Sequence, residues 1–251
     1  MKALLLTKQG SYKKMKYGDI NKPKLRSGYV RVQVEAAGLN PVDYKIAERG
    51  HDSFNYPVIL GFDVAGVVEK VGKDETFWKE GDRVYFHTGI ANVGGFGEFV
   101  LADSRGISRI PEGLSFIEAA SLPCAGFTAY QALVKRMNIQ PGKSILVTGA
   151  SGGVGTFAVQ IAVSMGLRVI ATCSTKNLEL LQILGAKDVI DYTKDNICEE
   201  VIGITGGRKV DYILDTVSSE SALATLDCLT YGGTMACIAG LPDLTKRDLL
   251  K

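Results

Sequence analysis

A glycine-rich loop near the middle of the chain constrains the fold more strongly than any other feature of the sequence. The apolar run Ser144–Thr148 is typical of a buried strand, and the loop Gly149-Ala-Ser-Gly-Gly-Val-Gly155 follows it directly, before a second apolar segment. Glycines in such a loop let the backbone turn tightly and approach a pyrophosphate at the N-terminus of a helix. The pattern therefore predicts one strand–loop–helix unit of a dinucleotide-binding sheet.

The chain after residue 124 alternates between strand-like and helix-like segments, which is the context that a glycine-rich loop needs. The expected strands span residues 144–148, 168–172, 189–191, 212–215 and 234–238. The expected helices span residues 127–137, 153–165, 177–184, 196–204 and 219–229. Such alternation builds a parallel sheet covered on both faces. We therefore predict a doubly wound α/β domain and prefer nucleotide binding to a purely structural turn.

The first half of the chain has a different character, with short alternating runs separated by glycines. These runs span residues 29–36, 64–71, 82–86 and 98–102. Alternation with a period of two is typical of half-buried strands. The sequence therefore predicts a small β-rich domain over residues 1–124, followed by the α/β domain over residues 125–251. A length of 251 residues accommodates both.

Charge and hydropathy exclude several classes of partner. The 29 Lys and Arg residues nearly balance the 27 Asp and Glu residues, for a net charge of +2, so electrostatics gives no reason to expect nucleic acid or an anionic membrane. The most apolar region, 156–173, is interrupted by Gln160 and Arg168, which argues against a membrane span of roughly 20 residues. The apolar stretch at residues 3–6 is too short for a secretion signal.

Five cysteines, at positions 124, 173, 198, 228 and 237, contain no Cys-x-x-Cys pair. An odd count without that spacing predicts free, mostly buried thiols in a reducing compartment. We therefore expect a cytoplasmic protein.

The same loop also fits the pattern T-G-x-x-x-G-x-G, the cofactor loop of short-chain dehydrogenases. That family needs a Tyr-x-x-x-Lys motif downstream of the loop. Tyr192, Tyr212 and Tyr231 are instead followed four places later by Asn, Thr and Met. The match at Tyr12 and Lys16 lies far upstream, and we interpret it as coincidence. Motif order therefore argues against this family.

Several stretches distributed over nearly the whole chain resemble one family. They are Ala37-Gly-Leu-Asn-Pro-Val-Asp43, Pro57-Val-Ile-Leu-Gly-Phe-Asp-Val-Ala-Gly66, Glu80-Gly-Asp-Arg-Val84, Gly97-Glu-Phe-Val100, Phe127-Thr-Ala-Tyr130, and Leu184-Gly-Ala186 with Asp191-Tyr192. Together with the domain order, they resemble the zinc-free quinone oxidoreductase branch of the medium-chain dehydrogenase/reductase superfamily. The resemblance implies a GroES-like catalytic domain followed by a Rossmann domain. Because the family normally has a sixth strand in the second domain, we expect this chain to be shortened at its C-terminus.

The positions at which zinc-dependent relatives hold their metal lack the necessary ligands. Leu39-Asn40 stands where those enzymes have Cys-His, and Gly61-Phe62-Asp63 stands where they have Gly-His-Glu. Cys124 falls near the third ligand position, but one thiol makes no tetrahedral site, and we expect a buried structural cysteine. His51 and His87 are isolated in the sequence, so we expect them at the surface or in local hydrogen bonds. These residues predict a protein that works without metal.

The resemblance also implies which residues carry the chemistry. Asn40 would line the nicotinamide and substrate pocket, Asp43 would support the local backbone, and Thr128 would meet the nicotinamide amide. An Asn-Pro dipeptide is also an ordinary turn signal, so a structural role for Asn40 stays open. Many family members have a tyrosine two residues after the aspartate, but here Tyr44 comes one residue after it and Lys45 stands in the expected place. The sequence therefore assigns no proton donor.

The residues after the second strand of the α/β domain predict the choice of dinucleotide. NAD-selective Rossmann folds place an acid about 20 residues beyond the glycine loop, whereas Thr172–Lys176 contains none. Lys176 would pair with a 2′-phosphate, unless it is only a solvated residue at the start of a helix. We therefore expect NADPH. The predicted cofactor contacts are Gly149, Gly152, Gly153, Val154, Gly155, Ser174, Thr175, Lys176 and, from the resemblance, Tyr192.

Two functions remain open from the sequence. The leading one is an NADPH-dependent oxidoreductase that transfers a hydride to a quinone or an α,β-unsaturated carbonyl compound without metal. The alternative is a nucleotide-binding protein with little or no turnover. We expect a small-molecule substrate, no nucleic acid or membrane partner, and a homodimer. A zinc alcohol dehydrogenase is a more distant third possibility.

Overall fold

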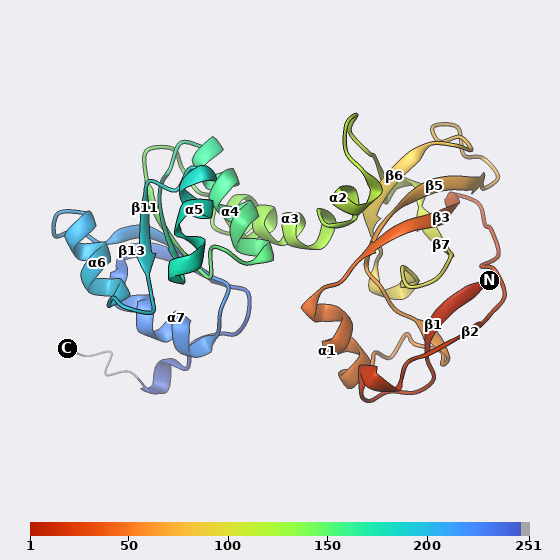
Figure 1. The fold of residues 1–251 in the computed structure, drawn as a ribbon, viewed down its shortest axis with the longest axis horizontal. Coiled ribbons are helices and arrows are strands. Elements are labelled where there is room, and N and C mark those ends of the chain that lie inside the picture. Colours follow the sequence, from red (N-terminus) through yellow and green to blue (C-terminus); the bar gives the residue numbers. More distant parts are fainter. Residues whose placement is uncertain (247–251) are drawn as a thin grey trace. The chain divides into compact units, whose positions relative to one another are not determined.

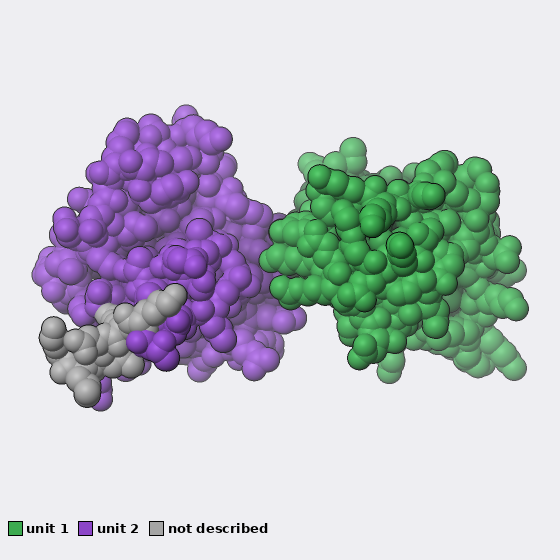
Figure 2. Space-filling view, turned by 90° about the horizontal axis from the view of Figure 1, so that it is seen from below, with its two compact units in different colours: residues 1–124 green, residues 125–251 purple. Residues whose placement is uncertain are grey.

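The computed structural model describes residues 1–246, and the chain forms two compact units, Met1–Cys124 and Ala125–Lys251 (Figure 1). Figure 2 shows the first unit in green and the second in purple. The end of the predicted second domain, 247–251, lies outside the described residues. Among the helices built from residues 1–246, none combines the length and apolar character that a bilayer span requires.

The first unit is built on a five-stranded antiparallel sheet with the strand order β7-β3-β5-β6-β8. Its strands are β3 (Tyr29–Gly38), β5 (Asp63–Val71), β6 (Arg83–His87), β7 (Phe99–Asp103) and β8 (Ser108–Arg109). Alternation along β3 places Val30 and Val32 in the core together with Trp78. The expected β-rich domain is confirmed, because the alternating runs of the sequence form its strands.

A smaller sheet and two helices complete the first unit. The sheet has the order β2-β1-β4 and consists of β1 (Lys2–Leu6), β2 (Lys16–Asp19) and β4 (Val58–Ile59). The helices are α1 (Pro41–Arg49) and α2 (Phe116–Ala120), and the short 3₁₀ helices are η1 (Tyr12–Lys14), η2 (Ile90–Asn92) and η3 (Ser104–Gly106). Leu6, Ala47 and Leu60 form a separate apolar cluster that fixes α1 against the smaller sheet.

The second unit contains a five-stranded parallel sheet with the order β11-β10-β9-β12-β13. Its strands are β9 (Ser144–Thr148), β10 (Arg168–Cys173), β11 (Asp188–Asp191), β12 (Val210–Asp215) and β13 (Leu229–Cys237). Its helices are α3 (Pro123–Tyr130), the π-helix η4 (Gln131–Arg136), α4 (Gly153–Ser164), α5 (Leu178–Ile183), α6 (Ile197–Ile204) and α7 (Ser219–Thr225), with the 3₁₀ helices η5 (Thr175–Asn177), η6 (Leu226–Cys228) and η7 (Leu244–Lys246). The strand order confirms the predicted Rossmann-type fold.

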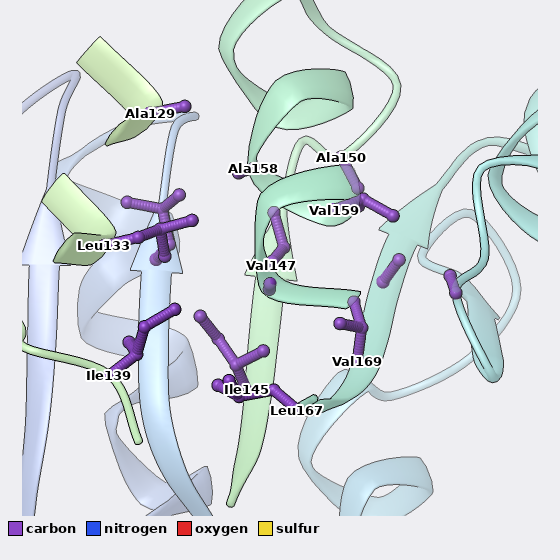
Figure 3. Packing of buried hydrophobic residues seen from close by; sticks show 14 of the residues in the cluster. Ala129, Leu133, Ile139, Ile145, Val147, Ala150, Ala158, Val159, Leu167 and Val169 are labelled. Atoms are coloured by element: carbon purple, nitrogen blue, oxygen red, sulfur yellow. The ribbon is translucent and has the colours of Figure 1, made fainter. Parts of the chain in front are cut away.

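Helices cover both faces of this sheet because successive strand residues point to opposite sides. Ile145 and Val147 of β9 belong to the apolar cluster that includes Val159 of α4, and Figure 3 shows these side chains close together. Leu146, between them, belongs to a second cluster that includes Val201 of α6. One buried strand therefore supplies the core on both sides, which explains its continuous apolar sequence.

Element boundaries differ from the sequence-based expectation in two places. The helix expected over residues 127–137 begins at Pro123, and its second half is the π-helix η4. The helix expected over residues 219–229 ends at Thr225, and β13 already begins at Leu229. The register between β12 and β13 shifts near Val210, so the start of β13 is irregular. Such a start lacks the regular alternation from which strands are predicted.

Helix α1 is absent from the sequence-based expectation because the Asn-Pro dipeptide before it is also a turn signal. Pro41 occupies the first turn of the helix, where the missing N–H group removes no helical hydrogen bond. A turn signal and a helix start therefore have the same sequence here.

The expectation of free thiols is wrong for two of the five cysteines. Cys198 in the first turn of α6 and Cys228 in η6 form a disulfide, with Cα atoms 5.2 Å apart. The other three cysteines form no disulfide, and only Cys173 among them is buried. Thirty residues separate the bonded pair, so their proximity arises from the fold and not from any local spacing motif.

Candidate functional site

The glycine loop between β9 and α4 requires glycine at several positions. Gly149 has a φ of +63°, and a Cβ atom there would lie 2.6 Å from the Thr216 hydroxyl oxygen. A Cβ atom on Gly155 would lie 2.6 Å from the Cα atom of Ala150 and would also contact the Gly149 carbonyl oxygen. Both contacts are far shorter than van der Waals separation. The backbone therefore leaves no room for a side chain at Gly149 or Gly155, and such a tight turn is typical of a phosphate-binding loop.

The N-terminus of α4 lacks a side-chain cap. Gly152 is the N-cap residue and carries no capping side chain, although α4 is 12 residues long. The first N–H groups of a helix have no partner within the helix and carry partial positive charge. They therefore suit an anion such as the pyrophosphate of a dinucleotide.

The loop also lies at the point where the strand order of the sheet reverses. β9 has β10 on one side and β12 on the other, and ligands of open α/β sheets bind beyond the carboxyl ends of the strands at this point. Thr216, just after β12, donates a hydrogen bond from its hydroxyl to the Thr148 carbonyl oxygen at 2.8 Å. Together, the glycine cradle, the uncapped helix and this position fit a dinucleotide.

The second predicted cofactor segment, after β10, is connected to the glycine loop. The Asn177 side-chain amide donates to the Ser151 hydroxyl oxygen at 3.1 Å, which joins the two segments. Ser174 is half-buried, Lys176 is exposed, and the Tyr192 side chain after β11 is 54% exposed. These three side chains are accessible to a ligand at the carboxyl ends of β10 and β11.

Thr175 has a different environment from the one that the sequence suggests. Its hydroxyl donates to the carboxylate of Asp191, at the end of β11. Asp191 also accepts from the Thr193 hydroxyl at 2.6 Å, and these bonds, led by that from Thr175, lower the pKa of Asp191 to about 2. The sequence predicts no acid after the second strand, but the neighbouring strand supplies one. Thr175 is therefore engaged within the protein.

Asp215 is a buried residue of this region that sequence reasoning does not single out. Its carboxylate accepts from the Thr148 and Ser221 hydroxyls at 2.6 and 2.5 Å. It also accepts from the backbone N–H groups of Val217 and Ser218. Asp215 thereby fixes the segment after β12 that contacts Gly149. The only sequence signal for it is an acid at the end of a predicted apolar strand.

Thr128 lies on α3 of the second unit and is half-buried, between the exposed Phe127 and the buried Ala129. The π-helix η4 continues α3, and such helices are frequent at functional sites. A surface hollow of about 480 Å³ adjoins this segment and is lined by Phe127, Tyr130, Gln131, Lys135 and Arg136. Thr128 therefore belongs to an accessible part of the second unit.

In the first unit, Asn40 and Asp43 form the start of α1. The Asp43 carboxylate accepts the backbone N–H of Asn40 at 2.8 Å, so Asp43 supports the local backbone as the sequence suggests. The two residues form a capping box at the start of α1, and the Asn40 side chain also donates from Nδ2 to the Asp63 carboxylate at 2.8 Å. The other oxygen of Asp63 accepts the Cys124 backbone N–H at 2.9 Å.

Two carboxyl groups are therefore buried together beside Asn40. Asp43 is 7% exposed and Asp63 is 1% exposed. Burial raises the pKa of each carboxyl group to about 6, because an ionised group is disfavoured away from water. Oδ1 of Asp43 is buried without a hydrogen-bond partner. Perturbed acids of this kind are concentrated at functional sites.

His87 belongs to the same group, and it makes a hydrogen bond with the backbone of the adjacent Thr88, in line with the expected local hydrogen bonding. It pairs with Asp63 across the ladder between β5 and β6, and its ring stacks on Phe62 with centroids 5.2 Å apart. Burial lowers the pKa of His87 below its ordinary value, so the ring is neutral near pH 7. His51 also makes the expected local hydrogen bond, to Ser53 at 2.8 Å.

The remaining predicted positions of the first unit contribute less. The Tyr44 ring is 42% exposed and lies 6.2 Å from the Tyr12 ring, between centroids. Cys124 is half-buried, not fully buried as expected. Within residues 1–246, no group of three or more His, Cys, Asp or Glu residues is arranged to hold a metal ion. Metal independence itself stays a prediction.

Comparison with protein families identifies both halves of the chain. Residues 26–112 match the alcohol dehydrogenase GroES-like domain. Residues 153–250 match the zinc-binding dehydrogenase family.

Individual proteins are similar over nearly the whole chain. A human quinone oxidoreductase is 32% identical over 92% of this chain and 71% of its own length. A 2-methylene-furan-3-one reductase of Solanum lycopersicum is 41% identical over 96% of this chain and 62% of its own length. A mycobacterial structure in complex with NADPH has a TM-score of 0.82 at 29% identity, covering 96% of this chain and 75% of that one.

These similarities favour an oxidoreductase that uses a nicotinamide cofactor over a nucleotide-binding protein with little turnover. The GroES-like first half, the Rossmann-type second half and the similarity to quinone oxidoreductases lead to one conclusion. The chain belongs to the zinc-free quinone oxidoreductase branch of the medium-chain dehydrogenase/reductase superfamily.

Proposed function

We propose that the protein is an NADPH-dependent reductase of quinones or α,β-unsaturated carbonyl compounds and works without metal. The observation that carries this proposal is the glycine cradle at the point where the strand order of the second unit reverses. We assign residues 125–251 to dinucleotide binding and residues 1–124 to catalysis. We further propose a cytoplasmic homodimer.

In this proposal, the dinucleotide is held mainly by backbone atoms. The uncapped N–H groups at the start of α4 bind the pyrophosphate. Ser174, Lys176 and Tyr192 are accessible to the 2′-phosphate that distinguishes NADPH from NADH. Thr128 contacts the nicotinamide amide. The bound NADPH supplies the hydride.

The protein's contribution to catalysis is positioning and electrostatic stabilisation. When a hydride adds to the electron-poor carbon of a conjugated carbonyl, an electron pair moves to the carbonyl oxygen. We propose that the Asn40 amide donates a hydrogen bond to this developing oxyanion. Asp43 keeps the backbone at Asn40 in place. The resulting oxyanion takes its proton from solvent, so a dedicated tyrosine donor is not required.

The names of similar proteins support the substrate class. One is a quinone oxidoreductase, and another is a 2-methylene-furan-3-one reductase. Quinones and such enones share an electron-poor carbon conjugated to a carbonyl group. The mycobacterial structure with NADPH supports the cofactor.

The direct test is consumption of NADPH in the presence of a panel of simple quinones and enones, with NADH measured in parallel. The proposal predicts turnover with at least one substrate class and a preference for NADPH. Binding of NADPH without turnover across the panel would instead favour the nucleotide-binding alternative. Light scattering of the purified protein tests the homodimer.

A further inference from the structure

The Asn40 side chain connects the start of α1 to the main sheet of the first unit. It belongs to the capping box that Asn40 and Asp43 form at the start of α1. Its Nδ2 also donates to Asp63 on β5 at 2.8 Å. The side chain is therefore held by the sheet as well as by its own helix.

Asp63 belongs to a row of residues across three strands. Gly38 of β3, Asp63 of β5 and His87 of β6 are paired side by side across the sheet. A Cβ atom on Gly38 would lie 2.9 Å from the Cβ atom of Asp63 and 2.5 Å from the Ala120 carbonyl oxygen. A side chain at position 38 would therefore crowd the Asp63 side chain, including Oδ2, the oxygen that accepts from Asn40.

Asp63 is itself held rigidly. One carboxylate oxygen accepts from Asn40 and the other from the Cys124 backbone N–H, and the residue is almost fully buried. An amide group has two N–H donors and one carbonyl acceptor. Fixing one donor therefore fixes the direction of the other donor and of the carbonyl oxygen.

Burying Asp43 and Asp63 together destabilises the folded state, which argues against a purely structural role for Asp63. The ionisable groups that face Asp63 are Asp43 on α1 and His87 on β6, and the contact from α3 is the Cys124 backbone. Burial raises the pKa of both carboxyl groups, and His87 is neutral. No cation of this group therefore offsets the buried acids, whereas an apolar pair would carry no such penalty.

We propose that Asp63 is a positioning residue, which acts through Asn40 by holding its amide in the orientation that hydride transfer requires. This inference rests on the proposed function and assigns Asp63 a role that the sequence does not. Asp63 itself touches neither substrate nor cofactor.

The kinetic test compares Asp63→Asn and Asp63→Ala with the parent. An asparagine at position 63 offers only one acceptor oxygen for the two donors that Asp63 now satisfies. We therefore expect kcat to fall roughly tenfold to a hundredfold, which corresponds to the loss of one hydrogen bond to a charged group. The KM for NADPH should stay unchanged, because the cofactor residues belong to the second unit.

A spectroscopic readout separates positioning from general destabilisation. With Asn and Asp both isotope-labelled, the Asn40 side-chain amide signals should shift with pH at the same midpoint as the Asp63 carboxyl carbon. The shift should persist in Asp43→Asn, which removes the other carboxyl group that titrates near pH 6, and disappear in Asp63→Asn. The kcat of Asp43→Asn should change with pH at this midpoint, which a merely structural contact would not cause, so the proposal is tested even if both Asp63 variants fail to fold.

Asp82→Asn is the matched control. Asp82 is also a buried aspartate of the first unit, but it accepts from Arg109 and the Lys79 backbone. This variant should keep the parent kcat and the Asn40 signals.

The outcomes distinguish the two proposals. The role of Asp63 alone would be overturned if folded Asp63 variants kept the parent kcat. It would also be overturned if the Asn40 signals did not shift at the midpoint of the Asp63 titration. Absence of NADPH consumption by the parent with every quinone and enone would instead overturn the proposed function.

Discussion

The two candidate sites of this protein are built from different parts of the chain. In the second unit, the loop from Gly149 to Gly155 offers backbone N–H groups at the start of α4, and its residues are contiguous. In the first unit, the group around Asn40 consists of side chains from α1, β5 and β6. The first kind of site binds through shape and main-chain dipoles, whereas the second depends on side-chain charge and hydrogen bonds. Substitutions should therefore affect binding in one unit and turnover in the other.

The largest effect should follow Asn40→Ala. Removal of one well-aimed hydrogen-bond donor from a catalytic pocket lowers the rate by roughly 10²–10³. The variant should still fold, but its free energy of unfolding should fall by about 1–3 kcal/mol, because the buried Asp63 carboxylate loses a hydrogen-bond donor. Steady-state kinetics with a quinone, together with unfolding followed by the fluorescence of Trp78, checks both statements. The exposed Lys45→Ala on the same helix is the control, and a folded Asn40→Ala with the parent rate would reduce Asn40 to a turn residue.

Gly155→Ala tests the backbone-built site. The added methyl group would contact the Gly149 carbonyl oxygen and Ala150, and overpacking of this kind costs roughly 1–3 kcal/mol. We expect lower thermal stability and at least about tenfold weaker NADPH binding, since the loop must open to accept the methyl group. Gly203→Ala is the control, because a Cβ atom there meets no atom within 4 Å. It should change neither thermal stability nor NADPH binding. Tight NADPH binding by Gly155→Ala would show that the loop does not need its compact form.

Lys176→Ala tests the choice of dinucleotide. Loss of an exposed positive charge near a phosphate should weaken NADPH binding roughly three- to tenfold and leave NADH binding nearly unchanged. Fluorescence titrations at fixed salt concentration provide the two affinities. Lys187→Ala is the matched control, because this exposed lysine precedes β11 and so lies at the opposite end of the parallel strands. Equal affinity of the parent for both dinucleotides would contradict the predicted preference.

The buried acids should make the stability of the first unit depend on pH. The folded pKa of Asp43 is raised to about 6, above the unfolded value, so the folded state binds more protons between about pH 4 and pH 6. Its contribution therefore favours folding at low pH and is lost as the pH rises through about 6. As the pH rises from 4 to 7, the free energy of unfolding of Asp43→Asn should therefore increase by on the order of 1 kcal/mol relative to that of the parent.

Urea unfolding followed by Trp78 fluorescence measures this dependence. Asp82→Asn should change the slope of the free energy of unfolding against pH in the direction opposite to Asp43→Asn. Burial raises the pKa of Asp82, but its hydrogen bonds from Arg109 and the Lys79 backbone outweigh burial and lower it overall. Parallel slopes for the parent and Asp43→Asn would show that Asp43 titrates normally.

The smallest expected effect is that of metal removal. By the family resemblance, Leu39, Asn40, Phe62 and Asp63 stand where zinc-dependent relatives are expected to carry their metal-binding motifs. Dialysis against a strong chelator should therefore leave turnover unchanged, with elemental analysis as the direct check. Stoichiometric zinc whose removal abolished turnover would contradict this prediction.

The contrast between the sites also explains what could be predicted from the sequence. The strand Ser144–Thr148 and the glycine loop were predictable because a buried parallel strand is continuously apolar and the turn after it excludes side chains at Gly149 and Gly155. The start of α1 was not, because Asn40-Pro41 suits both a turn and a helix N-terminus. Local patterns therefore identify elements whose constraints are themselves local.

The association of Asp63 with His87 and Asn40 could not be read from spacing. Twenty-three residues separate Asn40 from Asp63, and only the register of β5 against β3 and β6 brings them together. Asp191 beside Thr175 and Cys198 beside Cys228 depend in the same way on strand order and helix packing. Pairwise register is a property of the assembled sheet, and short motifs carry no information about it.

A loop made of main-chain groups has a consequence for genetic dissection. Replacing glycines by alanine in the segment from Gly149 to Gly155 adds atoms and removes no N–H group, so such a scan measures crowding instead of ligand contacts. Only substitution of an amide by an ester, through semisynthesis or an expanded genetic code, would delete a single donor at the start of α4. The contribution of each N–H group to dinucleotide affinity is therefore invisible to conventional mutagenesis and accessible to backbone chemistry.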